Sequence, residues 1–344
     1  MAASSSVAKP DLTPRWSADL PDYVNALRFA PDGALLAAPT LAGPVAVLEA
    51  ETGQVCYELA GHRGGTLAVA WSPDGRVLAT GGQDGQVRLM RGNTGTLMTV
   101  LDGGGGWVEH LAWSQDGRCV AVAIGKTARF FSASGERLGE VTEHESTITA
   151  LRWLPQTELV VTACYGGVQF LQAGQPQPVQ RFPWKGSILS LVISPDGKYL
   201  ASGNQDASVH VWRTKTGEDF QMSGYPTKVT TLAFSPNSRT LATGCGAAIL
   251  LWDFKGKGPA GKKPQILKGH TGLVTDLTFI QAQGNRRLVS VARDGVLCTW
   301  APHLSSRTVT ATAADVPLER LAVDPRERML VVASRFGRVD AFSL

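Results

Sequence analysis

The sequence has few of the side chains from which redox or metal chemistry is built. It contains only five cysteines and six histidines among 344 residues. No cysteine pair has the spacing of a zinc motif or of a disulfide framework, and no Cys-x-x-Cys-His haem attachment occurs. We expect the cysteines to be small buried residues in a reducing compartment, and predict no metal and no cofactor. They are Cys56, Cys119, Cys164, Cys245 and Cys298.

Long apolar runs are also lacking. Residues 1–10 contain no apolar core of signal-peptide length, and no 18-residue apolar run occurs anywhere. These absences argue against a standard secretion signal and a membrane span, so we expect a cytoplasmic protein with no membrane partner. Residues 1–11 are predicted to be a flexible tail.

Charge is sparse as well, since charged residues make up 18% of the chain and the formal net charge is +4. This balance neither demands nor excludes nucleic acid. The clearest basic cluster lies among Gly and Pro and is interpreted as an extended loop, so a nucleic-acid partner is not expected. It contains Lys255, Lys257, Lys262 and Lys263.

What the chain does contain is an eightfold repeat. Each copy has an apolar strand, a turn related to Ser-Pro-Asp-Gly, a Leu-Ala-Ser/Thr strand and a Val-x-Val-Trp strand. The residues before the turns recur every 40 to 45 residues, a period typical of a β-propeller blade. We call them the repeat-marker residues: Phe29, Trp71, Trp113, Trp153, Ile193, Phe234, Phe279 and Val323.

Several copies carry residues that resemble the WD40-repeat family, from about Trp16 to Leu344. They are Gly269-His270, Ser290, Asp294 and Trp300 in one copy, Ser202, Asp206 and Trp212 in another, and the Trp252-Asp253 pair. The resemblance implies that His270, Ser290, Asp294 and Trp300 form a hydrogen-bonded structural tetrad. Without hydrogen bonds to one another, a buried His and Asp would carry a desolvation cost of several kcal/mol.

Other copies keep only part of this tetrad. The second has His62, Thr80 and Asp84 but Met90 in place of Trp, and the fourth has His144 and Thr162 but Gly166 in place of Asp. Trp184 and Tyr225 stand at the same offset from their repeat-marker residues as His62 and His270. This offset predicts a structural role for Trp184 in the histidine's place, where its indole could donate to Asp206. Tyr225 has no turn Asp, so its hydroxyl is expected to reach water or a partner, with the same structural role as the alternative.

The position of the ends indicates eight blades, with seven as the alternative. Each copy supplies three strands, a fourth lies between copies, and the chain stops on the third strand of the eighth copy. The spare segment at about residues 12–18 is predicted to supply the missing outer strand of the last blade, which leaves no unpaired edge. Residues 12–344 are therefore expected to form one all-β propeller domain. Asp324-Pro325-Arg326 makes the eighth copy the least regular.

One face of such a ring is made by the loops that enter each first strand and the loops between second and third strands. Rigid loops of this kind bind partners at little ordering cost. By position, the predicted binding residues are Arg63, Trp107, Tyr165, Lys185, Tyr225, Lys228, Arg293, Arg335 and Phe336. Trp107, which follows four glycines, either anchors a partner or folds down to plug the channel.

These observations favour a scaffold that binds a protein or peptide and is not an enzyme. The histidines do not cluster, and the run Gly103 to Gly106 does not open a helix as a phosphate-binding loop must. The alternative is a small molecule or metal at the channel mouth, or an accessory role to a metal-handling enzyme. Cys164 and Cys245, at matching places in copies four and six, would be its testable residues.

Overall fold

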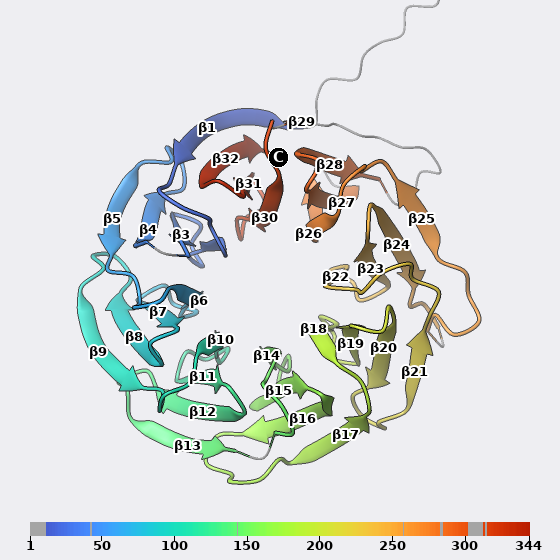
Figure 1. Cartoon of the computed structure of the whole chain (residues 1–344), viewed down its shortest axis with the longest axis horizontal. Coiled ribbons are helices and arrows are strands. Elements are labelled where there is room, and N and C mark those ends of the chain that lie inside the picture. Colours follow the sequence, from blue (N-terminus) through green and yellow to red (C-terminus); the bar gives the residue numbers. More distant parts are fainter. Residues whose placement is uncertain are drawn as a thin grey trace, which may run out of the picture.

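The described part of the chain forms a closed ring of strands. The computed structural model describes residues 12–41, 43–142, 144–256, 258–282, 285–301, 312–313 and 315–344. Within them lie eight antiparallel sheets of four strands each, arranged as blades around a central axis (Figure 1). The predicted eight-bladed, all-β propeller is confirmed. No helix in these ranges is long and apolar enough to span a bilayer. The expected tail at 1–11, Lys257 and His303 lie outside the described residues.

Strands are given from the innermost outward. Blade one contains β2 (Arg28–Phe29), β3 (Leu35–Pro39), β4 (Val45–Glu49) and β5 (Val55–Leu59), and blade two contains β6 (Thr66–Trp71), β7 (Val77–Gly82), β8 (Gln86–Arg91) and β9 (Leu97–Asp102). Blade three contains β10 (Val108–Trp113), β11 (Cys119–Ile124), β12 (Thr127–Ser132) and β13 (Arg137–Val141), and blade four contains β14 (Ala150–Trp153), β15 (Leu159–Cys164), β16 (Gly166–Gln172) and β17 (Gln180–Trp184).

The second half of the ring repeats this plan. Blade five contains β18 (Ile188–Ile193), β19 (Tyr199–Asn204), β20 (Val209–Arg213) and β21 (Asp219–Met222), and blade six contains β22 (Thr231–Phe234), β23 (Thr240–Cys245), β24 (Ala248–Asp253) and β25 (Gln265–Lys268). Blade seven contains β26 (Val274–Ala282), β27 (Asn285–Ala292), β28 (Val296–Trp300) and β29 (Thr312–Ala313), and blade eight contains β30 (Leu318–Val323), β31 (Met329–Ser334), β32 (Arg338–Ser343) and β1 (Thr13–Asp19).

The repeated turn is held by its own side chains. Ser72 Oγ donates to Asp74 Oδ1 (2.6 Å) and accepts from the Val77 amide (2.9 Å), and Gly75 adopts a φ of 70°. In the irregular eighth copy, Asp324 replaces the serine by accepting from the Met329 amide (2.6 Å). A carboxylate can therefore close the same turn, which is why the altered motif still makes a blade.

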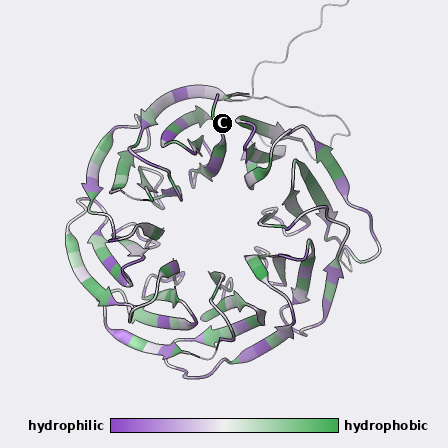
Figure 2. Cartoon of the chain, in the orientation of Figure 1, coloured by the Kyte–Doolittle hydropathy of each residue, from purple (hydrophilic) through white to green (hydrophobic). Residues whose placement is uncertain are grey.

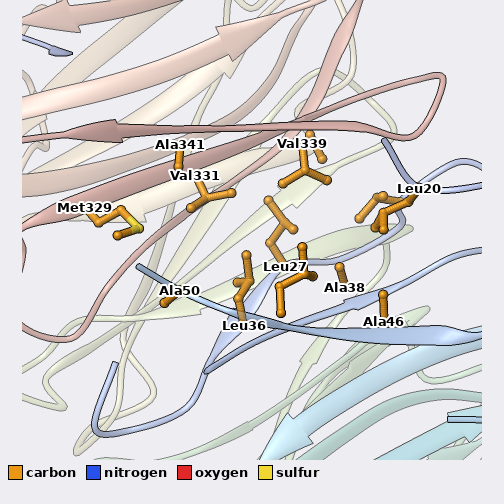
Figure 3. Packing of buried hydrophobic residues seen from close by; sticks show 13 residues of the cluster. Leu20, Leu27, Leu36, Ala38, Ala46, Ala50, Met329, Val331, Val339 and Ala341 are labelled. Carbon is orange, nitrogen blue, oxygen red and sulfur yellow. The ribbon is translucent and has the colours of Figure 1, made fainter. Parts of the chain in front are cut away.

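Blades adhere through apolar layers and through the repeat-marker tryptophans. The indole N–H groups of Trp71, Trp113 and Trp153 donate to carbonyls of the preceding blade's inner strand, at 3.0, 3.2 and 2.9 Å. Between blades eight and one, aliphatic side chains from both sheets interdigitate (Figure 3). Hydrophobic residues fill the blade strands, whereas polar and apolar residues mix along the outermost strands (Figure 2). The residues labelled in Figure 3 are Leu20, Leu27, Leu36, Ala38, Ala46, Ala50, Met329, Val331, Val339 and Ala341.

The ring closes where β1 adds to β32, as the sequence predicts. Thr13 pairs with Ser343 and Asp19 with Arg338 in an antiparallel register, and β1 runs along the outside of blade eight (Figure 1). Trp16 Nε1 also donates to the Ala50 carbonyl of blade one at 2.8 Å. The N-terminal strand thus covers the edge of β32 and joins the last blade to the first.

Candidate functional site

Blade seven contains the complete hydrogen-bonded chain that the resemblance implies. Trp300 Nε1 donates to Ser290 Oγ (2.8 Å), Ser290 Oγ lies 2.8 Å from His270 Nε2, and His270 Nδ1 lies 3.3 Å from Asp294. An indole only donates, so Ser290 Oγ accepts from it. An ionised carboxylate only accepts, so His270 carries its proton on Nδ1 and Nε2 accepts the serine proton. The imidazole then donates from Nδ1 to the carboxylate. Every polar atom of this buried chain has a partner, which fits a structural role.

Blades two and four keep shortened versions. In blade two, His62 contacts Asp84 through Nδ1 (2.8 Å) and Thr80 through Nε2 (2.9 Å), and Arg88 binds the same Asp84 at 3.2 Å. In blade four, His144 Nε2 lies 2.8 Å from Thr162 Oγ1, and Nδ1 donates to the Lys126 carbonyl at 2.9 Å. A backbone carbonyl of the neighbouring blade therefore replaces the missing aspartate.

Burial keeps these histidines neutral. Desolvation lowers the pKa of His270 below its usual value, although Asp294 opposes the shift. Desolvation lowers the pKa of His144 to about 4, because no carboxylate offsets it there. A neutral, fully bonded imidazole has no free lone pair with which to abstract a proton or bind a metal, so these residues do not form a catalytic centre.

Tyr225 requires a correction. Its side chain is buried, its hydroxyl accepts from Trp252 Nε1 (2.8 Å), and it also bonds Thr243 Oγ1 (3.1 Å). The expectation that this hydroxyl reaches water or a partner is therefore wrong, and Tyr225 does not belong to the exposed face. The phenol takes the place of the histidine ring because its oxygen can receive the indole proton directly.

Trp184 stands at the position of the tetrad histidine in blade five, but it contacts aromatic rings and does not join a hydrogen-bonded chain. Its ring packs against His210 with centroids 5.0 Å apart, and its edge approaches Trp212 at 6.4 Å. Asp206 instead accepts from Ser208 at 2.6 Å. The structure therefore replaces the predicted contact between Trp184 and Asp206 with an aromatic cluster in blade five.

The remaining predicted binding residues are exposed on one face, which we call the loop face. It is formed by the loops entering each innermost strand and by the loops joining the second and third strands of each blade. Arg293 is partly engaged there, since its Nε contacts Glu319 at 3.0 Å. The eight exposed residues are Arg63, Trp107, Tyr165, Lys185, Lys228, Arg293, Arg335 and Phe336.

Large apolar side chains are unevenly distributed over the surface. Among the described residues, five exposed ones lie in loop-face loops, seven lie on or beside outermost strands, and none lies in a turn of the opposite face. Trp107 is 54% exposed and Phe336 69% exposed, and neither lines the channel. Trp107 therefore does not plug it. The five are Leu41, Trp107, Tyr165, Leu273 and Phe336.

Sequence reasoning missed two of these five. Leu41 lies in the loop between β3 and β4, and Leu273 lies just before β26. Both are aliphatic, and the prediction favoured aromatic and basic anchors. Their place in the repeat, one in a loop between second and third strands and the other in a loop entering a first strand, was the signal that could have identified them.

Four of the five cysteines are buried as expected, whereas Cys56, on the outermost strand β5, is exposed, so the expectation was wrong for it. The two cysteines of the alternative hypothesis are buried and bonded to backbone. Cys164 Sγ donates to the Tyr165 carbonyl (3.0 Å), and Cys245 Sγ lies 3.6 Å from the Thr227 carbonyl. Over the described ranges, no three His, Cys, Asp or Glu side chains gather in a way that could hold a metal ion. Neither cysteine therefore has companion ligands at the channel mouth in this part of the chain.

The axis of the ring is a cavity of about 1160 Å³ lined by the innermost strands. Its lining includes four arginines and, among its other ionisable residues, one histidine and three carboxylates. They are Arg28, Arg152, Arg293, Arg320, His110, Glu109, Asp276 and Glu319. Sequence analysis concentrated on loops and did not single out the three arginines of the innermost strands or Asp276, although strand alternation places them on the axis.

Comparison with known proteins supplies relatives of the repeats. Residues 69–156 match the family model "Anaphase-promoting complex subunit 4 WD40 domain", and residues 176–213 and 219–253 match "WD domain, G-beta repeat". Over 181 residues the chain is 28% identical to Protein HIR1 of Gibberella zeae, covering 45% of this chain and 17% of that protein. Over 227 residues it is 25% identical to pre-mRNA-processing factor 19 of Oryza sativa subsp. japonica, covering 61% and 41%.

A solved structure extends the likeness over the whole ring. The computationally designed Ika8 protein superposes with a TM-score of 0.82 at 21% identity, covering 96% of this chain and 100% of that one. At this identity the likeness shows the fold alone. The chain spans less than half the length of the two curated relatives, so their activities do not transfer with the match.

Proposed function

Because the chain is a WD40-repeat β-propeller, we propose that it is a non-catalytic scaffold that binds a protein or peptide on its loop face. The fold itself does not specify an activity, so the argument rests on the surface. The binding surface consists of the exposed aromatic and aliphatic residues of that face with the basic residues between them.

The observation that carries the proposal is that, among the described residues, five exposed large apolar side chains lie in loop-face loops and none lies in a turn of the opposite face. Trp107, Tyr165 and Phe336 are each about half exposed or more, and all three stand in loop-face loops. Aromatic residues are frequent anchors in interfaces because each buries a large area with few rotatable bonds. Exposed cations, such as Arg63 and Lys228, provide charge-assisted hydrogen bonds around these anchors.

The proposal that the protein is not an enzyme is supported by the hydrogen bonds and ion pairs that occupy its buried titratable groups. His62, His144 and His270 are committed to buried hydrogen bonds within blades. The loop-face carboxylate Glu319 is engaged by Arg293. A general base needs a reachable lone pair, and these groups do not offer one to a substrate on the loop face.

The test is affinity capture from cell extract with two matched double variants. Trp107→Ala/Phe336→Ala removes the two most exposed aromatic rings of the loop face, and Leu97→Ala/Ile266→Ala removes equally exposed side chains from outermost strands. We expect a partner to be retained by wild type and by the outer-strand control and to be lost from the loop-face variant. Equal recovery by both variants, with unchanged thermal melts, would refute the loop face as the binding surface.

Location and nucleic acid are addressed by the same capture. We propose a cytoplasmic location, whereas a curated relative is named for pre-mRNA processing and another, from Arabidopsis thaliana, for association with a U3 snoRNP. Capture from separated cytoplasmic and nuclear extracts, with and without ribonuclease, distinguishes these settings. Recovery that requires intact RNA in nuclear extract would overturn both the location and the direct protein contact.

A further inference from the structure

The channel wall follows from strand alternation in the eight innermost strands. Residues one and three positions before each repeat-marker residue share a face, because side chains alternate along a strand. Most of these positions hold small residues, which leaves a cavity of about 1160 Å³ along the axis. Arg28 and Arg152 stand one position before the marker in blades one and four. Arg320, Asp276 and His110 stand three positions before it in blades eight, seven and three.

The three arginines have no acidic partner in ion-pairing range within the described chain. Arg28 Nη1 donates to the Leu27 carbonyl at 2.9 Å, and Arg152 Nη1 donates to the Leu151 carbonyl at 2.8 Å. Arg320 uses Nε and Nη1 on the carbonyls of Asn25 and Glu319, at 2.7 and 2.8 Å. Each guanidinium has five N–H donors, so most of the donors remain available to a ligand.

The acidic residues of the channel offset this charge only in part, since its lining contains four arginines against three carboxylates. Asp276 opposes the effect of desolvation on the pKa of Arg28. The two carboxylate oxygens of Asp276 accept hydrogen bonds from the backbone amides of Leu277 (2.9 Å) and Leu321 (3.1 Å), and burial raises the pKa of Asp276. Glu109 lies on the wall and its pKa is also raised by burial, whereas Glu319 is paired with Arg293. The excess charge of the channel is therefore positive.

Enclosure makes that charge costly. Desolvation and repulsion from Arg28 lower the pKa of Arg152 to about 10. Desolvation also lowers the pKa of Arg28; Asp276 raises this pKa and Arg320 lowers it further, and the result lies below the usual value. Burial and Arg152 also lower the pKa of His110 to about 4, so it stays neutral. Both Arg28 and Arg152 are nevertheless exposed to solvent inside the channel, where an anion can reach them.

We propose that the central channel binds a small polyanion with two or more phosphate groups, held between Arg28, Arg152 and Arg320. A guanidinium presents a planar fork that matches two phosphate oxygens. Arg28 and Arg320 come from the neighbouring blades one and eight, whereas Arg152 comes from blade four on the far side of the ring (Figure 1). A ligand that satisfies all of them must carry charge on more than one side. The three arginines are not among the predicted loop-face binding residues, and the proposal does not depend on a protein partner.

The experiment is titration calorimetry of the full chain with inorganic tripolyphosphate in metal-free, low-salt buffer. Saturable binding of one tripolyphosphate per chain is expected. Arg28→Ala and Arg152→Ala should each weaken it by about tenfold or more, since each removes charge-assisted hydrogen bonds. Arg137→Ala, on the outermost strand β13, is the matched control and should bind as wild type does.

Two outcomes would overturn the proposal. One is a failure to bind specifically. Either no saturable binding occurs at millimolar tripolyphosphate, or the Arg137 variant loses as much affinity as the channel variants, which would indicate non-specific attraction to a basic surface. The other is equally tight binding of a hexaglutamate peptide, which would assign the channel to an acidic chain segment and not to phosphate.

A melting experiment without ligand checks the variants themselves. Because Arg152 is repelled and has no ion-pair partner in the described chain, Arg152→Met should melt at or above the wild-type temperature while losing the stabilisation by tripolyphosphate. A clearly lower melting temperature would contradict the inference that this cation lacks compensation.

Discussion

The hydrogen-bonded chain in blade seven predicts a specific energetic coupling between Ser290 and Trp300. Ser290→Ala leaves both the Trp300 indole N–H and the His270 Nε2 atom buried without partners. At about 1–3 kcal/mol for each of the two buried unsatisfied groups, this substitution should cost about 2–6 kcal/mol of unfolding free energy. In a Trp300→Phe background the indole N–H no longer exists, so the same serine substitution should cost about 1–3 kcal/mol less. The double variant should therefore be more stable than the sum of the single effects.

The assay is a double-mutant cycle from equilibrium urea unfolding followed by circular dichroism. Trp113→Phe, in blade three, is the control partner for Ser290→Ala, because its indole donates to a backbone carbonyl of blade two. That pair should be additive within about 0.5 kcal/mol. Equal additivity for Ser290 and Trp300 would refute the inferred bond between them. The cycle is interpretable when transitions followed by dichroism and fluorescence coincide.

Three further predictions concern single side chains. Tyr225→Phe should lower the unfolding free energy by about 1–3 kcal/mol, because Trp252 loses its buried acceptor. His144 should remain neutral by NMR of labelled histidine at pH 5, since burial lowers its pKa to about 4; unfolded histidine takes up a proton below about pH 6.5, so its contribution to stability is present above that pH and is lost as pH falls toward 4. Trp16→Ala should lower the melting temperature and speed amide exchange in β32, because Trp16 binds the Ala50 carbonyl.

Each of these predictions has a control. Tyr165→Phe, whose ring is exposed, should leave stability unchanged, and an equal effect of both tyrosine substitutions would contradict the buried role of Tyr225. A His144 signal that titrates near pH 6.5 would contradict its burial. Exchange that accelerates equally in β15 of blade four, across the ring from blade eight, would mean that Trp16 stabilises the whole molecule and not only the closure.

Fold and blade count could be predicted because they depend on repeated local patterns. The repeat-marker residues and the Ser-Pro-Asp-Gly turns appear in the sequence at a fixed period, and each sets one hairpin whatever the rest of the chain does. The spare segment before the first copy predicted the strand that closes blade eight. These inferences needed only spacing and the rule that a sheet edge must be covered.

Contacts between side chains of different strands could not be predicted in the same way. The offset of Tyr225 matched that of the histidines, but spacing does not reveal that the Trp252 indole turns toward its hydroxyl. Trp184 stacks on His210 for a similar reason, since ring orientation depends on neighbouring strands. The channel arginines were in principle predictable from strand alternation, yet their lack of ion pairs depends on what faces them across the ring.

The closing strand gives the molecule a connectivity unlike that of its other blades. Ser17 and Asp340 are hydrogen-bonded at 2.5 Å although they are 323 residues apart in the sequence. Seven blades are built from strands that are consecutive in the sequence, whereas the eighth needs both ends of the repeat array together. Closure of the ring therefore requires both β1 and the three strands of blade eight. A chain that lacks part of β1 or of blade eight leaves an unpaired strand edge, and such an edge favours aggregation. Truncated chains therefore differ from intact rings by this exposed edge.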